Sequence, residues 1–506
     1  MKIGFDNAKY LSEQATIIRE RAEKYGRLYL EFGGKLINDM HAARCLPGYD
    51  PNAKLTLLAS LKDSADVIIC IYASDIESKK LRADFGRSYA DDTLKLIDDL
   101  TTQGLRVAGV VITRYTLQPA ATKFKNLLEK RGVKVYCHAP THGYPSNVDV
   151  IVSDEGYGKN EYVPVTRPIV VVTAPGPGSG KFGTCLSQIY HEYRNGKQAG
   201  YSKFESFPVW NVPIEHPLNV AYEAATLDLD DNHMIDPFHL AEYGVATVNY
   251  NRDVEAYPLL KAIWEKMTDG ECPYKSPTDM GLNRIGFGII DDDVVREASK
   301  QEVIRRYFRC VVDFERGLVD EVIVGKIDRL MRKLSLTPED RIPVLAARQA
   351  AQRAKEQGKG KAGGEIVSAA AIQLKDGQIV TGRNSDDMHA AAAMVLNAIK
   401  TLAGIPDQLH LITPEIIKSI SHMKNEILKG EYTSLSLDEA LICLAMSSPS
   451  NPAARIAVEK LSELRGCETH LTHMVGAGDR AGLRRLGCRF TSDPERATSA
   501  LFPIDE

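Results

Sequence analysis

The sequence predicts an α/β fold built on a large, doubly wound, mostly parallel sheet, and three observations lead to this prediction. Between residues 28 and 250, short apolar runs rich in Val and Ile alternate with helical stretches. These runs lack the polar alternation of half-exposed strands, which is typical of parallel strands covered on both faces. One of them leads directly into a glycine-rich loop and a helix, as phosphate-binding strands do.

The length of the chain predicts more than one domain. A chain of 506 residues is too long for a single hydrophobic core and suggests about three domains. We expect an α/β domain over residues 1–250, a helical domain over 251–357 and a smaller C-terminal α/β domain over 358–506. The segment Lys355–Gly364, KEQGKGKAGG, has the composition of a linker before the last domain.

The composition excludes several classes of protein. Hydrophobic residues make up 44%, charged residues 26%, and the net charge is −4, so no basic surface for nucleic acid is indicated. No apolar run reaches the length of a membrane span, and the first residues lack a signal region. The nine cysteines include no CxxC pair, which favours free thiols in a reducing compartment. We therefore expect a cytoplasmic protein that binds neither nucleic acid nor membrane.

The elements of the first domain follow from its apolar runs. The expected strands are Leu28–Phe32, Val67–Ala73, Val107–Thr113, Val133–His138, Val148–Val152, Ile169–Thr173 and Ala246–Tyr250. Residues 201–214 also begin as a strand-like stretch. This stretch then finishes in a proline-framed loop. The expected helices between the strands include Tyr89–Gln103, Ala120–Arg131 and Cys185–Tyr193.

The loop after Ile169–Thr173 is the strongest candidate for a binding site. Its sequence, APGPGSGKFGT, partly matches the phosphate-loop pattern G-x-x-x-x-G-K-[ST]. Pro175 replaces the first glycine, and Phe182 replaces the hydroxyl that would bind Mg²⁺. The expected phosphate ligands are the loop N–H groups and the lysine, with a later threonine as the metal hydroxyl: Gly176, Gly178, Ser179, Gly180, Lys181 and Thr184. The alternative is a tight strand-to-helix turn that binds no ligand.

Polar residues follow several other strands of the predicted sheet. Because parallel strands end at one edge, these residues are expected to gather beside the glycine loop. Arg82 and Arg114 are the candidate supplementary cations for a phosphate. His41, His138 and His142 are the candidate acid–base groups, although a structural role remains open for each. A metal site at His138 and His142 is disfavoured because Pro140 and Gly143 prevent a helix there.

An acidic run that follows the helix expected over Val220–Thr226 is the candidate metal site. Asp228 and Asp230 lie in DLDDNH, and carboxylates near histidines can hold Mg²⁺. The spacing matches no established ligand pattern. The alternative is a polar turn that caps a helix, because Asp and Asn are good N-caps.

The last domain begins with two predicted strands around the turn Asp376-Gly377 and a helix from Met388 to Leu402. This order resembles the cytidine-deaminase architecture, in which H-x-E and P-C-x-x-C hold zinc. Here Ala390-Ala391 follow His389, and no cysteine follows Pro449, so that chemistry is not expected. The spacing of Cys467, His470 and His473 invites a zinc site but establishes none.

Long motifs identify a resemblance that covers nearly the whole chain. They are KLINDMHAARCLPGYD at residues 35–50, TAPGPGSGK at 173–181, DMGLNR at 279–284, the AAIQLKDGQIVTG hairpin and GCETH near the end. Together they resemble a bacterial family called domain of unknown function 1846, or UPF0371. The resemblance implies a large α/β part, a helical part and a smaller C-terminal α/β part. It implies no particular activity.

The sequence thus predicts an enzyme that binds a nucleotide or a phosphorylated metabolite on its first domain. The expected chemistry is phosphoryl or nucleotidyl transfer, or ATP-dependent ligation, with an ATP-like nucleotide and Mg²⁺ as candidate cofactors. The expected partner is a small phosphorylated molecule, and we expect a homo-oligomer. The alternative is a non-catalytic binding or scaffold protein with a vestigial phosphate loop.

Overall fold

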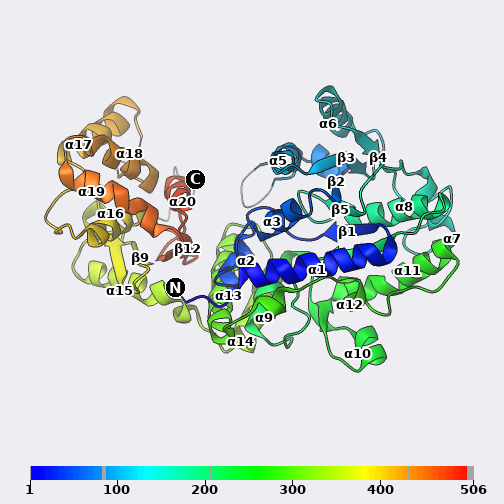
Figure 1. The fold of residues 1–506 in the computed structure, drawn as a ribbon. Helices are drawn as coiled ribbons and strands as arrows, with labels where there is room; N and C mark the ends of the chain where they lie inside the picture. Colours follow the sequence, from blue (N-terminus) through cyan, green and yellow to red (C-terminus); the bar gives the residue numbers. More distant parts are fainter. Residues whose placement is uncertain (1, 82–86, 206, 431–433, 498–506) are drawn as a thin grey trace. The chain divides into compact units, whose positions relative to one another are not determined.

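The computed structural model describes residues 2–81, 87–205, 207–430 and 434–497 (Figure 1). The chain divides into two compact units, residues 2–299 and 300–506, and the boundary falls inside α13 (Asp292–Glu315). Each unit contains a β-sheet covered by helices, which confirms the α/β class. The division into three domains stays a prediction.

The first unit is built on a sheet of six parallel strands in the order β4-β3-β2-β5-β1-β6. At its centre, Val171 of β5 lies between Leu30 of β1 and Val67 of β2. The strands are β1 (Leu28–Phe32), β2 (Ala65–Tyr72), β3 (Arg106–Thr113), β4 (Val135–Cys137), β5 (Ile169–Thr173) and β6 (Gly200–Phe204).

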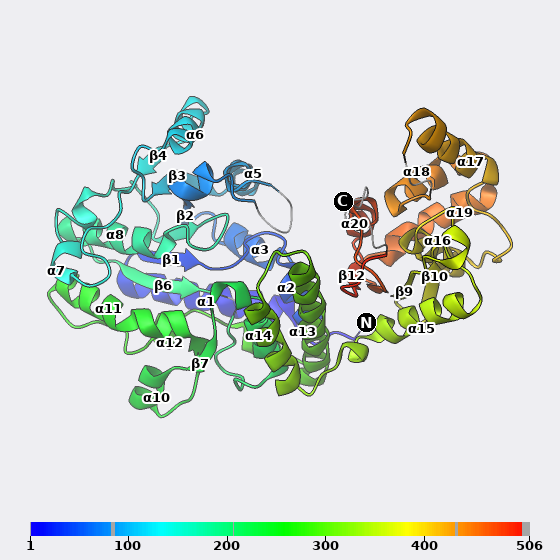
Figure 2. The same ribbon diagram turned by 180° about the vertical axis from the view of Figure 1, so that it is seen from behind.

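Helices cover both faces of this sheet, so it is doubly wound as predicted (Figures 1 and 2). Leu28 and Leu30 pack in one core with Ile18 of α1, while Tyr29 between them packs in another core with Ile189 of α8. The first face carries α1 (Asn7–Tyr25), α3 (Ala53–Ser60), α5 (Tyr89–Thr102) and α6 (Pro119–Lys130), and the second carries α8 (Lys181–Arg194) and α11 (Asn251–Thr268).

Two predicted strands of the sheet are different in the structure. Residues 148–152 form the short helix α7 (Val148–Ile151), because the Asn147 side chain accepts a hydrogen bond from Val150 N at 3.1 Å and caps it. The run 246–250 contains β8 (Val248–Tyr250), which pairs with β7 (His233–Ile235) in a separate antiparallel sheet. The sixth strand is instead β6, at the start of the strand-like stretch 201–214.

The first unit also contains several shorter helices outside the six-stranded sheet. Its helices are α2 (Met40–Cys45), α4 (Ala73–Glu77), α9 (Pro217–Glu223), α10 (Pro237–Tyr243) and α12 (Pro277–Met280). Its 3-10 helices are η1 (Tyr157–Lys159), η2 (Leu227–Leu229) and η3 (Ile285–Gly288).

The second unit has a four-stranded mixed sheet in the order β10-β9-β11-β12. Only β11 and β12 are parallel. The strands are β9 (Ala369–Gln373), β10 (Ile379–Arg383), β11 (Glu468–Leu471) and β12 (Arg489–Ser492). The helices after α13 are α14 (Glu321–Lys333), α15 (Ile342–Glu356), α16 (Ala390–Ala403), α17 (Pro414–His422), α18 (Leu437–Ser447), α19 (Pro452–Lys460) and α20 (Ala477–Leu486).

The core of the second unit forms around one face of β9. Ala370 and Ile372 of β9 pack with apolar residues of α16, α18 and α19. Helix α15 packs against β9, β10 and β11, so the first residues of the predicted linker continue a helix of this unit. Short helices η4 (Pro338–Asp340), η5 (Ala362–Gly364), η6 (Met423–Ile427) and η7 (Leu461–Leu464) complete it. The likeness to cytidine deaminases stays a prediction.

Two predictions about the chain as a whole can be compared with the structure. All nine cysteines are free thiols, and all except Cys137 and Cys310 are buried. In the described ranges, no helix combines the length and apolar character needed to cross a membrane.

Candidate functional site

The glycine loop, residues 174–180, lies at the point where the connections of the sheet diverge. It follows β5, which lies between β2 and β1. From β2 the chain continues outward to β3 and β4, whereas from β5 it crosses β1 to reach β6 on the opposite side. Ligands of open parallel sheets bind where such connections separate, at the carboxyl ends of the strands. The topology therefore places the loop at the position expected for a binding site.

Side chains from the end of β3 hold the carbonyl groups of the glycine loop. Thr113 Oγ1 donates a hydrogen bond to Ser179 O at 2.8 Å, and Arg114 donates one to Gly178 O. Ser179 Oγ in turn donates to Gly176 O at 2.8 Å. Gly180 adopts a φ of 84°, and a Cβ there would lie 2.9 Å from the Thr113 side chain. The backbone geometry at this position therefore requires glycine.

The N–H groups of the loop and of the first turn of α8 are not held in this way. Within the described residues, those of Gly178, Gly180, Lys181, Phe182 and Gly183 have no hydrogen-bond acceptor. The first bond of the helix joins Thr184 N to Gly180 O at 3.0 Å. Free N–H groups at the start of a helix, together with the positive end of its dipole, attract anions.

Lys181 and Thr184, the two side chains expected to complete the phosphate site, have different environments. Lys181 makes no hydrogen bond or ion pair with another described residue. Thr184 is 1% exposed, and its Oγ1 accepts from Cys70 Sγ at 3.4 Å between helix and sheet. Burial raises the pKa of the Cys70 thiol to about 12, so this contact is neutral at physiological pH. The hydroxyl expected to bind a metal is therefore directed into the core.

The two candidate arginines cannot be compared directly, because Arg82 lies outside the described residues. Arg114 is exposed, and its guanidinium lies 3.5 Å from the centre of the Tyr72 ring. This cation–π contact and the bond to Gly178 O orient Arg114 along the loop. Its role in the structure is to hold the loop, which leaves its remaining N–H groups for a ligand.

The three candidate histidines lie in different environments. His138 is 3% exposed, and its Nε2 donates to Glu161 O at 3.0 Å. Burial lowers the pKa of His138 to about 4, so it is neutral at pH 7. His142 is exposed on the following loop. His41 is buried in α2 and lies edge-on to Tyr222, at 4.4 Å between ring centres.

The candidate metal carboxylates are exposed, whereas their neighbour is not. Asp228 and Asp230 lie at η2 on the surface. Asp231 is buried and accepts from Arg252 Nη1 at 2.7 Å. Over the described part of the chain, no three His, Cys, Asp or Glu side chains are grouped as a metal site would require.

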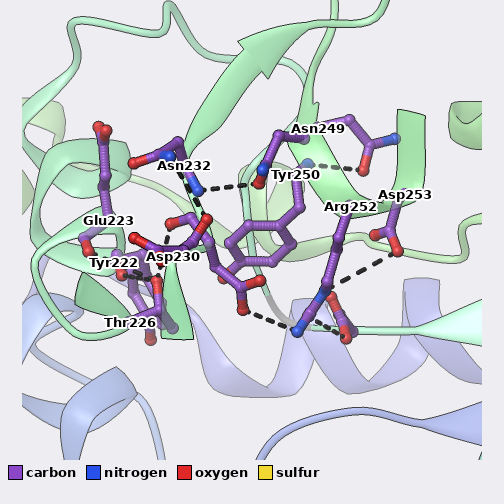
Figure 3. A network of polar contacts seen from close by, with 12 residues as sticks. Tyr222, Glu223, Thr226, Asp230, Asn232, Asn249, Tyr250, Arg252 and Asp253 are labelled. Carbon is purple, nitrogen blue, oxygen red and sulfur yellow. Dashed lines mark hydrogen bonds and ion pairs between the residues drawn. The ribbon is translucent and has the colours of Figure 1, made fainter. Parts of the chain in front are cut away.

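Arg252 is the centre of a charged network that the sequence does not indicate. Figure 3 shows its guanidinium among carboxylates, with Asp253 beside it. Besides Asp231, it contacts Glu205 at 3.3 Å and Asp253 at 3.9 Å. Lys203 Nζ also contacts Asp253 at 2.6 Å and Glu205 at 3.2 Å. We call these five residues the Arg252 cluster. The sequence does not indicate the cluster, because Lys203 and Arg252 come close together only when the positions of β6 and β8 in the fold are known.

Charge compensation within the Arg252 cluster fixes its ionisation. Burial raises the pKa of Glu205, but Lys203 and Arg252 reverse this effect and hold it below its usual range. Lys181 contributes to the same lowering, so its charge acts near Glu205 without a direct ion pair. At the end of β1, buried Lys54 pairs with Asp39 at 3.2 Å and lies beside Gly33 O. The charged groups that follow β1 and β6 are thus mostly paired with one another.

Comparisons with known proteins identify the family. Residues 3–335 match the domain of unknown function DUF1846, N-terminal, and residues 339–502 match its C-terminal counterpart. UPF0371 proteins of Clostridium tetani (strain Massachusetts / E88) and Clostridium botulinum (strain Langeland / NCTC 10281 / Type F) are each 53% identical over 502 residues, 99% of both chains. The chain belongs to the DUF1846 family, as its motifs predicted.

Proposed function

We propose that this member of the family binds the phosphate group of a nucleotide or phosphorylated metabolite at the glycine loop. The observation that carries the proposal is the unequal use of the loop backbone. Its carbonyl groups accept from Thr113, Ser179 and Arg114, while its N–H groups have no acceptor in the described ranges. A turn that served only to connect β5 to α8 would gain stability by bonding those N–H groups.

The charges around the loop support the same proposal. Lys181 stands at the first position of α8 without an ion pair to any described residue, whereas Lys54, Lys203 and Arg252 are each paired with carboxylates. A phosphate held by the N–H groups would supply the missing negative charge. In a phosphoryl or nucleotidyl transfer, or a ligation, the same groups would stabilise charge on the phosphoryl oxygens. Homo-oligomer formation stays a separate prediction.

A nucleotide with Mg²⁺ fits this site only in part. The N–H groups and Lys181 suit its phosphates, but Thr184 is bonded to Cys70 inside the core. Glu205 and Asp253, two carboxylates of the Arg252 cluster, are neutralised by Lys203 and Arg252. If bound, the nucleotide would supply a phosphoryl group, and the residues of this chain would hold its oxygens.

A non-catalytic binding protein is the second candidate function, and two observations favour it. His138 is neutral and donates its Nε2 hydrogen to a backbone carbonyl, so it is poorly placed to move a proton. Phe182 packs edge-on against Tyr201, with 5.7 Å between ring centres, where a phosphate loop would carry a hydroxyl. Under this function the ligand binds at the same N–H groups and is not transformed.

Calorimetric titration of the full chain with ATP, GTP and glucose 6-phosphate tests the binding proposal. Lys181→Ala is expected to weaken the tightest ligand about tenfold or more, a loss of about 1.4 kcal/mol. Lys197→Ala is the matched control, since Lys197 is exposed just beyond the other end of α8. Equal affinity in Lys181→Ala and wild type, or binding of none of the three, would refute the proposal. Release of phosphate or pyrophosphate from the bound ligand would show that the protein is an enzyme and not only a binding protein.

A further inference from the structure

Glu205, one of the five residues of the Arg252 cluster, lies on the side of the sheet that α8 covers. Tyr201 of β6 packs on that side, with its ring centre 5.7 Å from that of Phe182, whereas Phe204 packs in the core on the other side. Because successive side chains of a strand point to opposite faces, Glu205, directly after Phe204, faces the α8 side. Lys181 precedes Phe182 in the first turn of α8, so the end of β6 and the start of α8 are neighbours.

The Glu205 side chain also leans from β6 toward the glycine loop. Strand β1 lies between β6 and β5, and its Phe32 pairs with Phe204, so Gly33 and Glu205 follow side by side. A Cβ at Gly33 would overlap the Glu205 side chain, which therefore lies across the end of β1. Neighbouring strands are about 4.8 Å apart, so β6 and β5 end about 10 Å from each other. The carboxylate of Glu205 lies within this interval, next to the loop.

One oxygen of the Glu205 carboxylate makes all of its recorded contacts. Oε1 lies 3.2 Å from Lys203 Nζ and 3.3 Å from Arg252 Nη2, whereas Oε2 has no hydrogen bond or ion pair with a described residue. Asp253 differs, because both of its oxygens accept from Lys203 at 2.6 Å. The Glu205 side chain is 18% exposed, so solvent reaches it. Glu205 thus keeps one hydrogen-bond acceptor open beside the loop.

The surroundings of Glu205 limit what this acceptor can bind. A second cation would be repelled by Lys203 and Arg252, which already lie on the same carboxylate. An anionic group would be repelled by the carboxylate itself. A neutral donor such as a hydroxyl meets neither penalty, and its hydrogen bond to an ionised acceptor is stronger than one between neutral groups.

We propose that Glu205 accepts a hydrogen bond from a hydroxyl group of the ligand whose phosphate the glycine loop binds. The ligand is then a sugar phosphate, in which a phosphate ester and several hydroxyls lie within one small molecule. This inference rests on the proposed phosphate binding and adds the substrate class to it. Glu205 selects the ligand, while the loop N–H groups and Lys181 hold its phosphate.

The test compares ligands that share a phosphate ester and differ in their hydroxyls. The full chain is titrated calorimetrically with glucose 6-phosphate, ribose 5-phosphate and ethyl phosphate, which has no hydroxyl. The wild type should bind at least one sugar phosphate about tenfold or more tightly than ethyl phosphate. Glu205→Gln should lose about tenfold in affinity for that sugar phosphate and keep its affinity for ethyl phosphate. Asp253→Asn, which removes a carboxylate without an open oxygen, is the matched control and should keep the preference.

Gly33→Ala provides a second variant that moves the carboxylate without removing its charge. The added Cβ would occupy the position of the Glu205 side chain, which must then shift. The preference for the sugar phosphate should fall as it does in Glu205→Gln. General damage to the structure would instead weaken sugar phosphates and ethyl phosphate alike. If Glu205→Gln does not fold, Gly33→Ala decides the question.

Several results would overturn the proposal. They are equal affinity of the wild type for sugar phosphates and ethyl phosphate, an unchanged preference in Glu205→Gln and Gly33→Ala, equal losses for all ligands in these variants, and the same loss of preference in Asp253→Asn. Each of them leaves phosphate binding at the glycine loop intact. Binding of none of the three ligands, or binding that Lys181→Ala does not weaken, would refute the proposed function and this inference with it.

Discussion

The glycine loop and the Arg252 cluster both include residues at the carboxyl end of the same parallel sheet. They differ in whether their charged groups and hydrogen-bond donors have partners within the protein. In the Arg252 cluster, two cations and three carboxylates pair with one another. In the loop, the N–H groups and Lys181 have no partner among the described residues. Charge that is paired internally supports the fold, and donors that are left open indicate where a ligand binds.

Arg252→Ala is expected to have the largest effect on stability, because it leaves Asp231 and Glu205 without their shared cation. We expect a loss of about 3 kcal/mol, the low end for breaking a buried pair, because the Arg252 side chain is 41% exposed. Urea unfolding measures it. Arg194→Ala is the control, since the exposed Arg194–Asp154 pair should contribute less than about 1 kcal/mol. Equal losses would mean that the cluster is not a structural unit.

His138 is hydrogen-bonded within the protein, and its lowered pKa should make the free energy of unfolding depend on pH. Its folded pKa of about 4 lies below the unfolded value near 6.5, so the unfolded state binds the proton first. The contribution of His138 to stability is therefore full well above pH 6.5 and falls by about 2.5 kcal/mol as the pH drops to about 4.5. His138→Gln should flatten this window in urea unfolding, and exposed His142→Gln should not. An unchanged slope in His138→Gln would assign the acid sensitivity to other groups.

Alanine substitutions at two glycines of the loop distinguish the cost of backbone strain from the cost of a steric contact. Gly180→Ala combines a φ of 84° with a Cβ 2.9 Å from Thr113, so we expect a loss of about 2 kcal/mol and weaker phosphate binding. Gly178→Ala has a φ of 72° but open space around the Cβ, so about 1 kcal/mol is expected. Unfolding and calorimetry measure both. A Gly180→Ala protein with full stability and affinity would contradict the loop geometry.

Gly183 tests the sign of the charge that the loop attracts, with the smallest effect on stability. It lies in the first turn of α8, and a Cβ at this residue would have no neighbouring atom within 4 Å, so Gly183→Ala should stabilise the helix by about 0.5–1 kcal/mol. Gly183→Asp should also be tolerated, because a carboxylate suits a helix N-terminus. Only the aspartate should weaken phosphate binding by repulsion. Equal affinity in the two variants would argue against an anion at this position.

Much of the first unit could be predicted because its signals are local. The strands β1 and β5 begin and end where their apolar runs do, and α5 and α6 agree to within one residue at each end. The strand predicted over residues 148–152 was wrong, because a run of five residues rich in Val and Ile does not distinguish a strand from a capped helical turn. The side chain of Asn147 decided between them.

Only the glycine loop of the candidate site and its lysine could be predicted from the sequence. The glycines and Lys181 could be named because a strand, a glycine loop and a helix are consecutive in the chain. Arg252, Lys203 and Glu205 could not, since they meet only after β6 and β8 have been placed. The acidic run was recognised, but the sequence cannot tell which carboxylate turns inward. Asp231 does so, and Asp228 and Asp230 stay at the surface.

By itself, the sequence determined the α/β class, the family and the loop between β5 and α8, because apolar periodicity and glycine content act over a few residues. Tertiary structure alone decided which polar groups are satisfied. Thr184 bonds to Cys70, His138 to Glu161 O and Arg252 to Asp231, while Lys181 and His473 Nδ1 have no partner among the described residues. Hydrogen bonds and ion pairs join residues far apart in the chain, so strand order and packing had to be established before these contacts could be known.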